Sequence, residues 1–284
     1  MGGSILVTGA RGFTGCHFIS LAEGCGYQAV PLNSDLSDRE SIMAELCNQS
    51  FDYVVHLGAI SFVGHGDSSD FYRVNVIGTQ NLLDALLVSS SLPKKVLIAS
   101  SANIYGNAEV GIISEEIAPA PVNHYAISKL AMEHLAKTYF NKLPIVIARP
   151  FNYTGPGQNV RFVIPKIVDH FKRRANMIEL GNTDVTREYN DVRFVCNSYL
   201  RLMESDVNAS LLNVCTSKGY RLSEVIEELK NITGHSLSVS VNPQFVRENE
   251  IKILLGDSSN LCDSIGPISE YSLSDTLRMM LQES

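Results

Sequence analysis

The feature that most constrains this chain is a glycine-rich turn that directly follows a short strand at the N-terminus. Residues 4–9 form an apolar, β-branched run that ends in Gly9, and Gly12 and Gly15 follow at intervals of three before a helical pattern begins. Such glycines allow a sharp turn and a close approach of the backbone to a pyrophosphate. The N–H groups at the helix N-terminus favour the anion. The segment therefore predicts a dinucleotide-binding loop of the GxxGxxG type, with an ordinary βα turn as the alternative.

Strand and helix patterns alternate along the first half of the chain. Apolar strand patterns follow at 27–32, 52–59, 94–100 and 144–150, and helical patterns at 37–49, 71–90 and 125–141. Strands that read as continuous apolar runs between helices predict a parallel sheet covered on both faces. Past residue 150, glycine and proline cluster and the elements shorten. We therefore expect an α/β fold, with a Rossmann-type doubly wound parallel sheet in residues 1–150. A smaller C-terminal α/β substrate lobe is expected in 151–284, with some segments returning to the main domain.

Composition excludes several classes of function. The chain has 284 residues, 45% hydrophobic and 19% charged, with a formal net charge of −7, which argues against nonspecific nucleic-acid binding. No apolar run approaches the ~20 residues that span a bilayer, and no charged leader precedes the first strand. We expect a cytoplasmic protein without a membrane partner. The six cysteines form no CxxC pair and the seven histidines do not cluster, so reduced structural thiols and no metal site are expected.

A tyrosine and a lysine stand four residues apart in the helical pattern at 125–141. Tyr125 and Lys129 therefore share one face of the helix and can address one ligand. A free phenol, with a pKa near ~10, is a poor proton donor or acceptor at neutral pH, but a nearby cation lowers that pKa. Lys129 can supply this cation. The alternative interpretation is a partly buried tyrosine beside a solvated lysine.

Several segments together resemble the extended short-chain dehydrogenase/reductase (NAD-dependent epimerase/dehydratase) family. They are TGARGFTG at 8–15, HLGA at 56–59, NVIGTQNLLDA at 75–85, SSANIYG at 100–106, YAISK at 125–129 and RPFNYTGPGQ at 149–158. The resemblance implies an enzyme that acts on nucleotide-activated sugars with a serine, a tyrosine and a lysine. Matched by motif, Ser101 is the serine, Tyr125 the acid/base, and Lys129 the residue that binds the nicotinamide ribose and tunes Tyr125.

The resemblance also implies the residues that hold the dinucleotide. These are Gly9, Arg11, Gly12, Phe13, Thr14, Gly15, Asn33, Asp35, Leu36, Leu57, Gly58, Ala59, Tyr125, Lys129 and Pro150. An acid at the end of the second strand would bind the ribose hydroxyls of NAD, but this chain has Asn33 and Ser34 there. Arg11 could meet a 2′-phosphate. Asp35 is either the ribose acid or, as we prefer, an adenine contact beside Leu36. NADP is therefore the expected cofactor, with NAD as the alternative.

The C-terminal half resembles reductases that act on GDP-4-keto-6-deoxy-D-mannose. The substrate residues implied are Ser61, Ser101, Ala102, Asn103, Asn152, Val163, Arg187 and Arg247. Asn152 and Arg187 are expected to approach the pyrophosphate or sugar, and Arg247 to clamp a phosphate. Surface ion pairs with Glu188 or Glu250 are the alternative for the arginines, and a turn role for Asn152. The sequence also departs from those reductases near Arg247, where they carry an Arg-Pro pair and an aspartate.

The expected reaction is hydride transfer to C4 of the keto sugar with Tyr125 as general acid, giving GDP-D-rhamnose or GDP-6-deoxy-D-talose. Ala102 and Asn103 replace the acid pair of the related 4,6-dehydratases, which argues against dehydration. Two alternatives stay open. One is a nucleotide-sugar 4-epimerase with tightly held NAD, and the other is a noncatalytic dinucleotide-binding sensor or scaffold.

The family resemblance further implies a homodimer formed by two paired helices. Apolar residues occur on more than one face of the helical patterns at 71–90 and 125–141, although such an excess is usually core. The residues concerned are Val76, Leu83, Leu87, Leu130, Met132 and Leu135.

Overall fold

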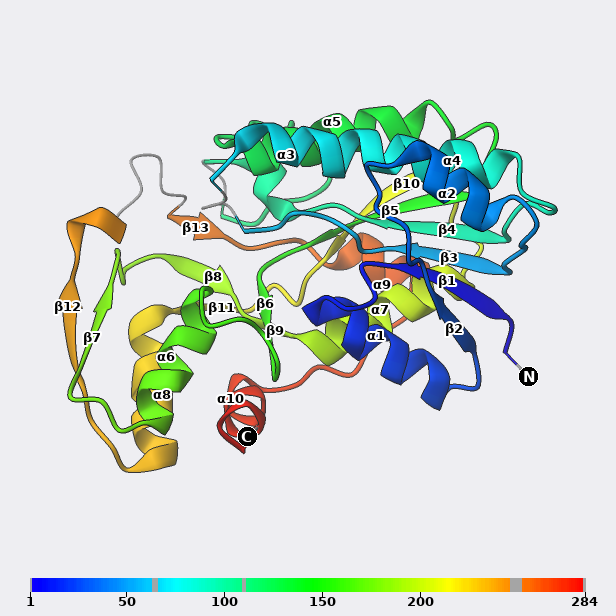
Figure 1. Ribbon diagram of the computed structural model, residues 1–284. Coiled ribbons are helices and arrows are strands. Elements are labelled where there is room, and N and C mark those ends of the chain that lie inside the picture. The colour runs from blue at the N-terminus through cyan, green and yellow to red at the C-terminus, as the bar shows by residue number, and fades with distance from the viewer. Residues whose placement is uncertain (1, 63–65, 109–110, 246–251, 283–284) are drawn as a thin grey trace.

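The computed structural model describes residues 2–62, 66–108, 111–245 and 252–282, and it is built around one parallel sheet (Figure 1). The order of its strands is β10-β5-β4-β3-β1-β2, and all neighbours are parallel. The bounds are β1 Ser4–Thr8, β2 Gln28–Pro31, β3 Tyr53–His56, β4 Lys95–Ala99, β5 Ile145–Pro150 and β10 Ser210–Val214. The order reverses between β1 and β3, where sheets of this kind bind ligands beyond the strands' carboxyl ends. The predicted fold class is confirmed.

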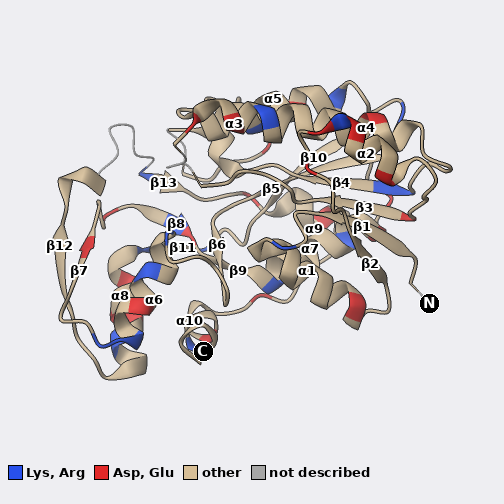
Figure 2. Ribbon diagram, viewed as in Figure 1, with Lys and Arg blue, Asp and Glu red and all other residues tan. Residues whose placement is uncertain are grey.

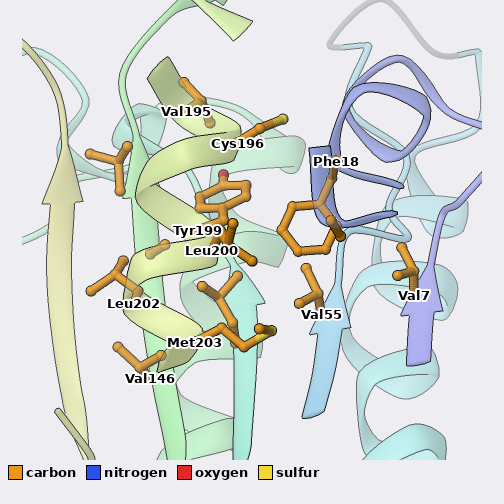
Figure 3. Close-up of a cluster of buried hydrophobic side chains, with 14 of the residues drawn as sticks. Val7, Phe18, Val55, Val146, Val195, Cys196, Tyr199, Leu200, Leu202 and Met203 are labelled. Carbon is orange, nitrogen blue, oxygen red and sulfur yellow. The ribbon is translucent and has the colours of Figure 1, made fainter. Parts of the chain in front are cut away.

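Helices cover both faces of this sheet (Figure 1). One face carries α2 Arg39–Leu46, α3 Ser68–Tyr72, η1 Arg73–Ile77, α4 Gly78–Leu87 and α5 His124–Lys137. The other carries α1 Phe13–Gly24, α7 Val192–Glu204 and α9 Ser259–Ile265. Figure 3 shows part of the second interface, where Phe18 of α1 and Tyr199 of α7 lie over Val7 and Val55 of the sheet. Strands that are buried on both faces explain the continuous apolar runs in the sequence.

The remaining elements form a second layer of structure beyond β5. Its helices are α6 Val163–Lys172, α8 Leu222–Thr233 and α10 Leu273–Gln282, which share one apolar cluster. Its strands are β6 Tyr153–Thr154, β7 Met177–Leu180, β8 Thr186–Glu188, β9 Asn190–Asp191, β11 Gly219–Arg221, β12 Ser238–Val241 and β13 Ile253–Leu254. The chain also has two short 3₁₀ helices, η2 Ala102–Tyr105 after β4 and η3 Pro243–Phe245 after β12. Strand β10 and helices α7 and α9 belong to the second half of the chain but pack on the main sheet.

The single helix predicted at 71–90 is divided in the structure. It consists of α3, the π-helical turn η1 and then α4. The π turn accommodates Asn75, whose buried amide bonds both backbone groups of Ile60 and therefore has to face inward. Insertions of this kind in a helix are frequent at functional sites. Periodicity alone cannot reveal such a turn, because one extra residue per turn barely changes the apolar pattern.

Charged residues are dispersed over the surface. Figure 2 shows acidic and basic segments interspersed along the helices, without a continuous basic face in that view. Within the ranges that the structure describes, no helix has both the length and the apolar character needed to cross a membrane.

Candidate active site

The glycine loop between β1 and α1 is closely packed against the backbone around it. Gly9 has a φ of +67°, and a Cβ there would lie 2.7 Å from the Gly58 nitrogen. A Cβ on Gly15 would lie 2.2 Å from the carbonyl oxygen of Gly9. Any other residue would push the loop away from the strand or the helix, which explains the glycines at these positions.

Helix α1 begins at this loop without a side-chain cap. Gly12 occupies the N-cap position, and the first turn contains no acidic residue. In contrast, α2 and α5 are capped by Asp38 and Asn123. The first N–H groups of α1 therefore have no side-chain acceptor, and the helix dipole is not offset locally. Such an N-terminus suits a diphosphate, and Arg11 lies exposed on the same loop.

Two predicted loop residues contact a tyrosine that the sequence analysis did not select. The Thr14 hydroxyl lies 2.7 Å from the Tyr153 hydroxyl, and the Phe13 ring stacks on the Tyr153 ring with centroids 6.0 Å apart. Tyr153 belongs to β6, just after β5, so this contact joins the glycine loop to the second layer. The motif RPFNYTGPGQ contains Tyr153, but nothing in the sequence shows that it meets Thr14.

Beside the loop, the predicted adenine residues follow β2. The Asp35 carboxylate accepts hydrogen bonds from the backbone and hydroxyl of Ser37, which lower the pKa of Asp35. Leu36 is buried, and its side chain lies where a Cβ on Gly58 or Gly78 would have to fit. Asp35 is thus the acceptor of a tight turn, and Leu36 belongs to the core at the end of β3.

A buried histidine lies at the carboxyl end of β3, among three residues from other elements. The Thr79 hydroxyl donates to the Asn75 carbonyl, so its oxygen accepts from His56 Nε2 at 2.8 Å. The other ring nitrogen, Nδ1, then accepts the Thr8 hydroxyl at 2.6 Å. The Thr8 oxygen itself accepts the Gly58 N–H. Burial, followed by the nearby Lys129 charge, lowers the pKa of His56 to about 3. His56 is therefore a neutral structural link, and Leu57, Gly58 and Ala59 follow it directly.

The same network reaches the helix that carries Tyr125. Asn75 Nδ2 donates to Ser128 Oγ at 3.0 Å, and the Ser128 hydroxyl donates to the carbonyl of Tyr125 at 2.7 Å. Asn75 and Ser128 are both buried. The backbone of Tyr125 is consequently fixed relative to the end of β3.

Ser101 and Tyr125, the predicted serine and acid/base, lie close enough for the Ser101 hydroxyl to influence the pKa of Tyr125. Ser101 precedes η2, and its oxygen accepts from the backbone N–H and side-chain amide of Asn103, both at 3.2 Å. The Ser101 proton therefore remains available to another oxygen. Burial raises the pKa of Tyr125, while its hydrogen bond with Ser101 lowers it. The Tyr125 ring rests against Phe71 and is 8% exposed.

The predicted effect of Lys129 on the phenol needs correction. Lys129 Nζ donates to the carbonyl of Ala99 at 2.7 Å, and burial outweighs all other influences on Tyr125, whose pKa ends above its ordinary value. Burial also lowers the pKa of Lys129 to about 8, although the Glu133 carboxylate one turn further along α5 raises it. Lys129 lies at the end of β4 beside the pair, but in this structure the phenol is not made more acidic.

A buried ion pair lies below these residues, and the sequence analysis did not identify it. The Arg149 guanidinium binds Glu133 through two hydrogen bonds, of 2.9 and 2.7 Å, and both residues are almost fully buried. The Ser100 hydroxyl donates to Glu133 at 2.6 Å, and Arg149 also donates to the Tyr105 hydroxyl. Glu133 follows Lys129 by four residues, so the two share one helix face. This spacing was the only indication in the sequence that Glu133 belongs near the site.

The predicted substrate residues lie in several elements. Ser61 and Asn152 are exposed, and Val163 is the first residue of α6. Ala102 is buried in η2, next to Asn103. Pro150, the predicted cofactor residue that ends β5, is buried beside Val214 of β10. Arg247 lies outside the described residues.

Arg187 and Glu188 do not form the surface ion pair that was the alternative interpretation. They are neighbours in β8, so their side chains point to opposite faces. The Glu188 carboxylate is fully buried and accepts from the N–H groups of Gly256 and Thr216 and from the amide of Asn190. Burial raises the pKa of Glu188. Glu188 therefore organises the loops around β8.

The histidines and cysteines form neither a metal site nor a disulfide among the described residues. In the part of the chain that the structure describes, no three His, Cys, Asp or Glu side chains are grouped as a metal site. The cysteines are free, and Cys196 and Cys215 are buried.

Comparison with known proteins agrees with this geometry. The family model described as GDP-mannose 4,6 dehydratase matches residues 30–280. The chain belongs to this family. It is 36% identical to a GDP-6-deoxy-D-talose 4-dehydrogenase of Aggregatibacter actinomycetemcomitans, and 32% identical to a GDP-6-deoxy-D-mannose reductase of Pseudomonas aeruginosa. Each alignment covers 98% of this chain and 96% of the relative.

A solved structure gives the same result for the fold. The structure of RMD from Pseudomonas aeruginosa complexed with NADPH superimposes with a TM-score of 0.90 at 31% identity, covering 98% of this chain and 97% of that one. The resemblance stated from the motifs is thus confirmed at the level of family and fold. The family model is described as a dehydratase. However, this chain has Ala102 and Asn103 at the two positions where, by the resemblance, the related 4,6-dehydratases carry an acid pair.

Proposed function

We propose that this protein is an oxidoreductase acting at C4 of a GDP-linked 6-deoxyhexose. In this proposal it reduces GDP-4-keto-6-deoxy-D-mannose with NADPH, giving GDP-D-rhamnose or GDP-6-deoxy-D-talose. The names of the two relatives, a 4-dehydrogenase and a reductase of GDP-6-deoxyhexoses, support the substrate class. The observation that carries the proposal is the placement of Ser101, Tyr125 and Lys129 together at the carboxyl edge of the parallel sheet, where Ser101 lowers the pKa of Tyr125 and Lys129 bonds the end of β4.

The residues of the pair suit a reduction. Burial raises the pKa of Tyr125, so the phenol is protonated at neutral pH and has a proton to give to the developing alkoxide, which is a strong base. Ser101 has its oxygen occupied by Asn103 and can donate its own proton to the sugar oxygen. Tyr125 then transfers its proton to that oxygen as the carbonyl becomes an alcohol. Lys129, which donates one hydrogen bond to the Ala99 carbonyl, would offer its remaining N–H donors to a ribose hydroxyl.

The dinucleotide would be held by the glycine loop. Gly9, Gly12 and Gly15 let the backbone approach its diphosphate, and the uncapped N-terminus of α1 supplies N–H donors. When bound, the nicotinamide supplies or accepts the hydride. NADPH is the proposed cofactor because a structural neighbour binds it and no acid follows β2 directly in sequence, while NADH is the alternative.

The proposal is tested by following oxidation of NADPH with GDP-4-keto-6-deoxy-D-mannose. We expect one equivalent of NADPH to be consumed per product. Replacing Tyr125→Phe removes the proton donor and should lower kcat by ~10²-fold or more while leaving NADPH affinity unchanged. Tyr139→Phe is the matched control, because Tyr139 lies just past α5 and bonds Asp84 instead.

Other outcomes favour the alternatives. Epimerisation without net consumption of dinucleotide would assign the chain to the 4-epimerases. Tight dinucleotide binding without turnover of any 4-keto nucleotide sugar would favour the sensor. Full activity of Tyr125→Phe would remove Tyr125 from its role as general acid.

A further inference from the structure

An acidic side chain from helix α2 lies at the end of β2, where none follows in sequence. The Glu45 carboxylate accepts the backbone N–H of Asn33 at 2.9 Å and that of Ser34 at 2.8 Å. It also accepts the Ser34 hydroxyl at 2.5 Å and the Asn33 amide at 3.3 Å. Both of its oxygens are therefore held by the two residues that leave the strand.

This strand end adjoins the glycine loop. The hydrogen bond from the Leu32 N–H to the Val7 carbonyl continues the β1–β2 ladder up to the residue before Asn33. In doubly wound sheets, the residue at this place distinguishes the two dinucleotides, because an acid binds the ribose hydroxyls of NAD and repels the 2′-phosphate of NADP. The sequence places Asn33 and Ser34 here, and the fold adds the carboxylate of Glu45 from 12 residues further along the chain.

The carboxylate stays charged at neutral pH. Burial raises the pKa of Glu45, but the hydrogen bonds from Ser34 and Asn33 outweigh burial and bring the pKa below its ordinary value. Two backbone N–H groups, a hydroxyl and an amide form a set of donors that would equally suit the oxygens of a phosphate. In this protein the carboxylate occupies them. Asp35, the next residue in the sequence, adds a second negative charge beside this set.

We infer that Glu45 sets the selectivity between NADPH and NADH, by occupying the donors of Asn33 and Ser34 and by repelling the 2′-phosphate. This inference rests on the proposed function, since it concerns the cofactor of that site. A chain without the Glu45 charge binds NADPH better relative to NADH. Glu45 thereby moderates the preference for NADPH from the neighbouring helix, without itself following β2 in sequence.

Direct binding of each dinucleotide to the purified full-length chain tests this inference without any sugar substrate. We define the selectivity as the Kd for NADH divided by the Kd for NADPH. In Glu45→Gln, which keeps the shape and an acceptor oxygen but loses the charge, the selectivity should rise roughly tenfold. Glu45→Ala, which also frees the four donors, should change it in the same direction by at least as much. Glu40→Gln, with the same loss of charge on an exposed part of α2, should leave it unchanged.

If the Glu45 carboxylate only holds the turn after β2 in place, a different result is expected. In that case, Glu45→Gln and Glu45→Ala would weaken both dinucleotides by the same factor and leave the selectivity unchanged, which overturns the inference. A shift towards NADH would also overturn it. If both dinucleotides bind with altered selectivity but no keto sugar is turned over, the proposed reaction fails while the inference stands. If neither dinucleotide binds any of the proteins, both are wrong.

Discussion

At the scale of single residues, the site depends on how burial and charge balance around Lys129. Burial lowers the pKa of this ammonium to about 8, and the Glu133 carboxylate limits the decrease. Glu133 is in turn held by two hydrogen bonds from Arg149 and one from Ser100, the residue before Ser101. Lys129 and the buried ion pair are therefore electrostatically coupled, although only Lys129 was evident from the motifs.

This balance predicts the pH dependence of the reaction. With the pKa of Lys129 near 8, kcat/KM for reduction should fall as the pH rises through about 8 and the ammonium loses its proton. Glu133→Gln removes the charge that raises this pKa, so the decline should begin about one pH unit lower. Glu227→Gln, on the surface of α8, should leave the profile unchanged.

Loss of a buried ion-pair partner costs ~3–5 kcal/mol, so Glu133→Gln needs a thermal unfolding curve beside the kinetics. The position of the alkaline limb, rather than the rate, is the measurement. An unchanged limb in a folded Glu133→Gln variant would show that Glu133 does not tune Lys129.

At the scale of elements, neutral hydrogen bonds join the carboxyl ends of β1 and β3 to the helical layer of η1, α4 and α5. His56 at the end of β3 bonds Thr8 of β1 and Thr79 of α4, and the π turn directs Asn75 towards Ser128 of α5. These links hold the glycine loop, the strand end and the Tyr125 helix in one arrangement. Protonation of His56 at Nδ1 would leave the Thr8 hydroxyl proton without its acceptor.

Acid sensitivity follows from that constraint. The pKa of His56 is about 3 in the folded protein and 6.5 in the unfolded chain. As the pH falls, the unfolded chain therefore takes up the proton before the folded protein does. The free energy of unfolding contributed by His56 is fully present above pH 6.5 and falls towards pH 3, by up to ~1.4 kcal/mol per pH unit. Denaturant titrations at several pH values should show this slope in the wild type.

The slope should be smaller in His56→Gln, which cannot take up the proton. His235→Gln is the control, because His235 bonds the Ala175 carbonyl in the second layer and should leave the slope in place. Equal slopes in wild type and His56→Gln would contradict the assigned role of His56.

At the scale of the whole molecule, the expected homodimer remains a prediction. Of the residues first considered for it, Leu83 and Met132 are fully buried core, and Leu87, Leu130 and Leu135 are partly buried against the core. The exposed apolar residues on the same helical layer include Ile77, at 47%, and Ile127, at 39%. They belong to η1 and α5, which lie side by side on one face of the sheet (Figure 1).

A charge on this layer should disrupt such a dimer. Ile127→Glu would place an unpaired carboxylate in a desolvated interface, so we expect light scattering after gel filtration to show a dimer for the wild type and a monomer for the variant. Val241→Glu, exposed on β12, should stay dimeric. A monomeric wild type would exclude the dimer.

The sequence by itself determined the class of fold and selected the candidate catalytic residues, because both depend on local patterns. Glycines at fixed intervals, apolar runs of strand length, and a tyrosine and lysine one helical turn apart are all set within a few residues. The tertiary structure decided what surrounds them. Glu45 reaches the end of β2 from another helix, Arg149 reaches Glu133 from β5, and Tyr153 reaches Thr14 from β6. These partners are distant in the chain, and their hydrogen bonds and charges act only once folding has brought them together.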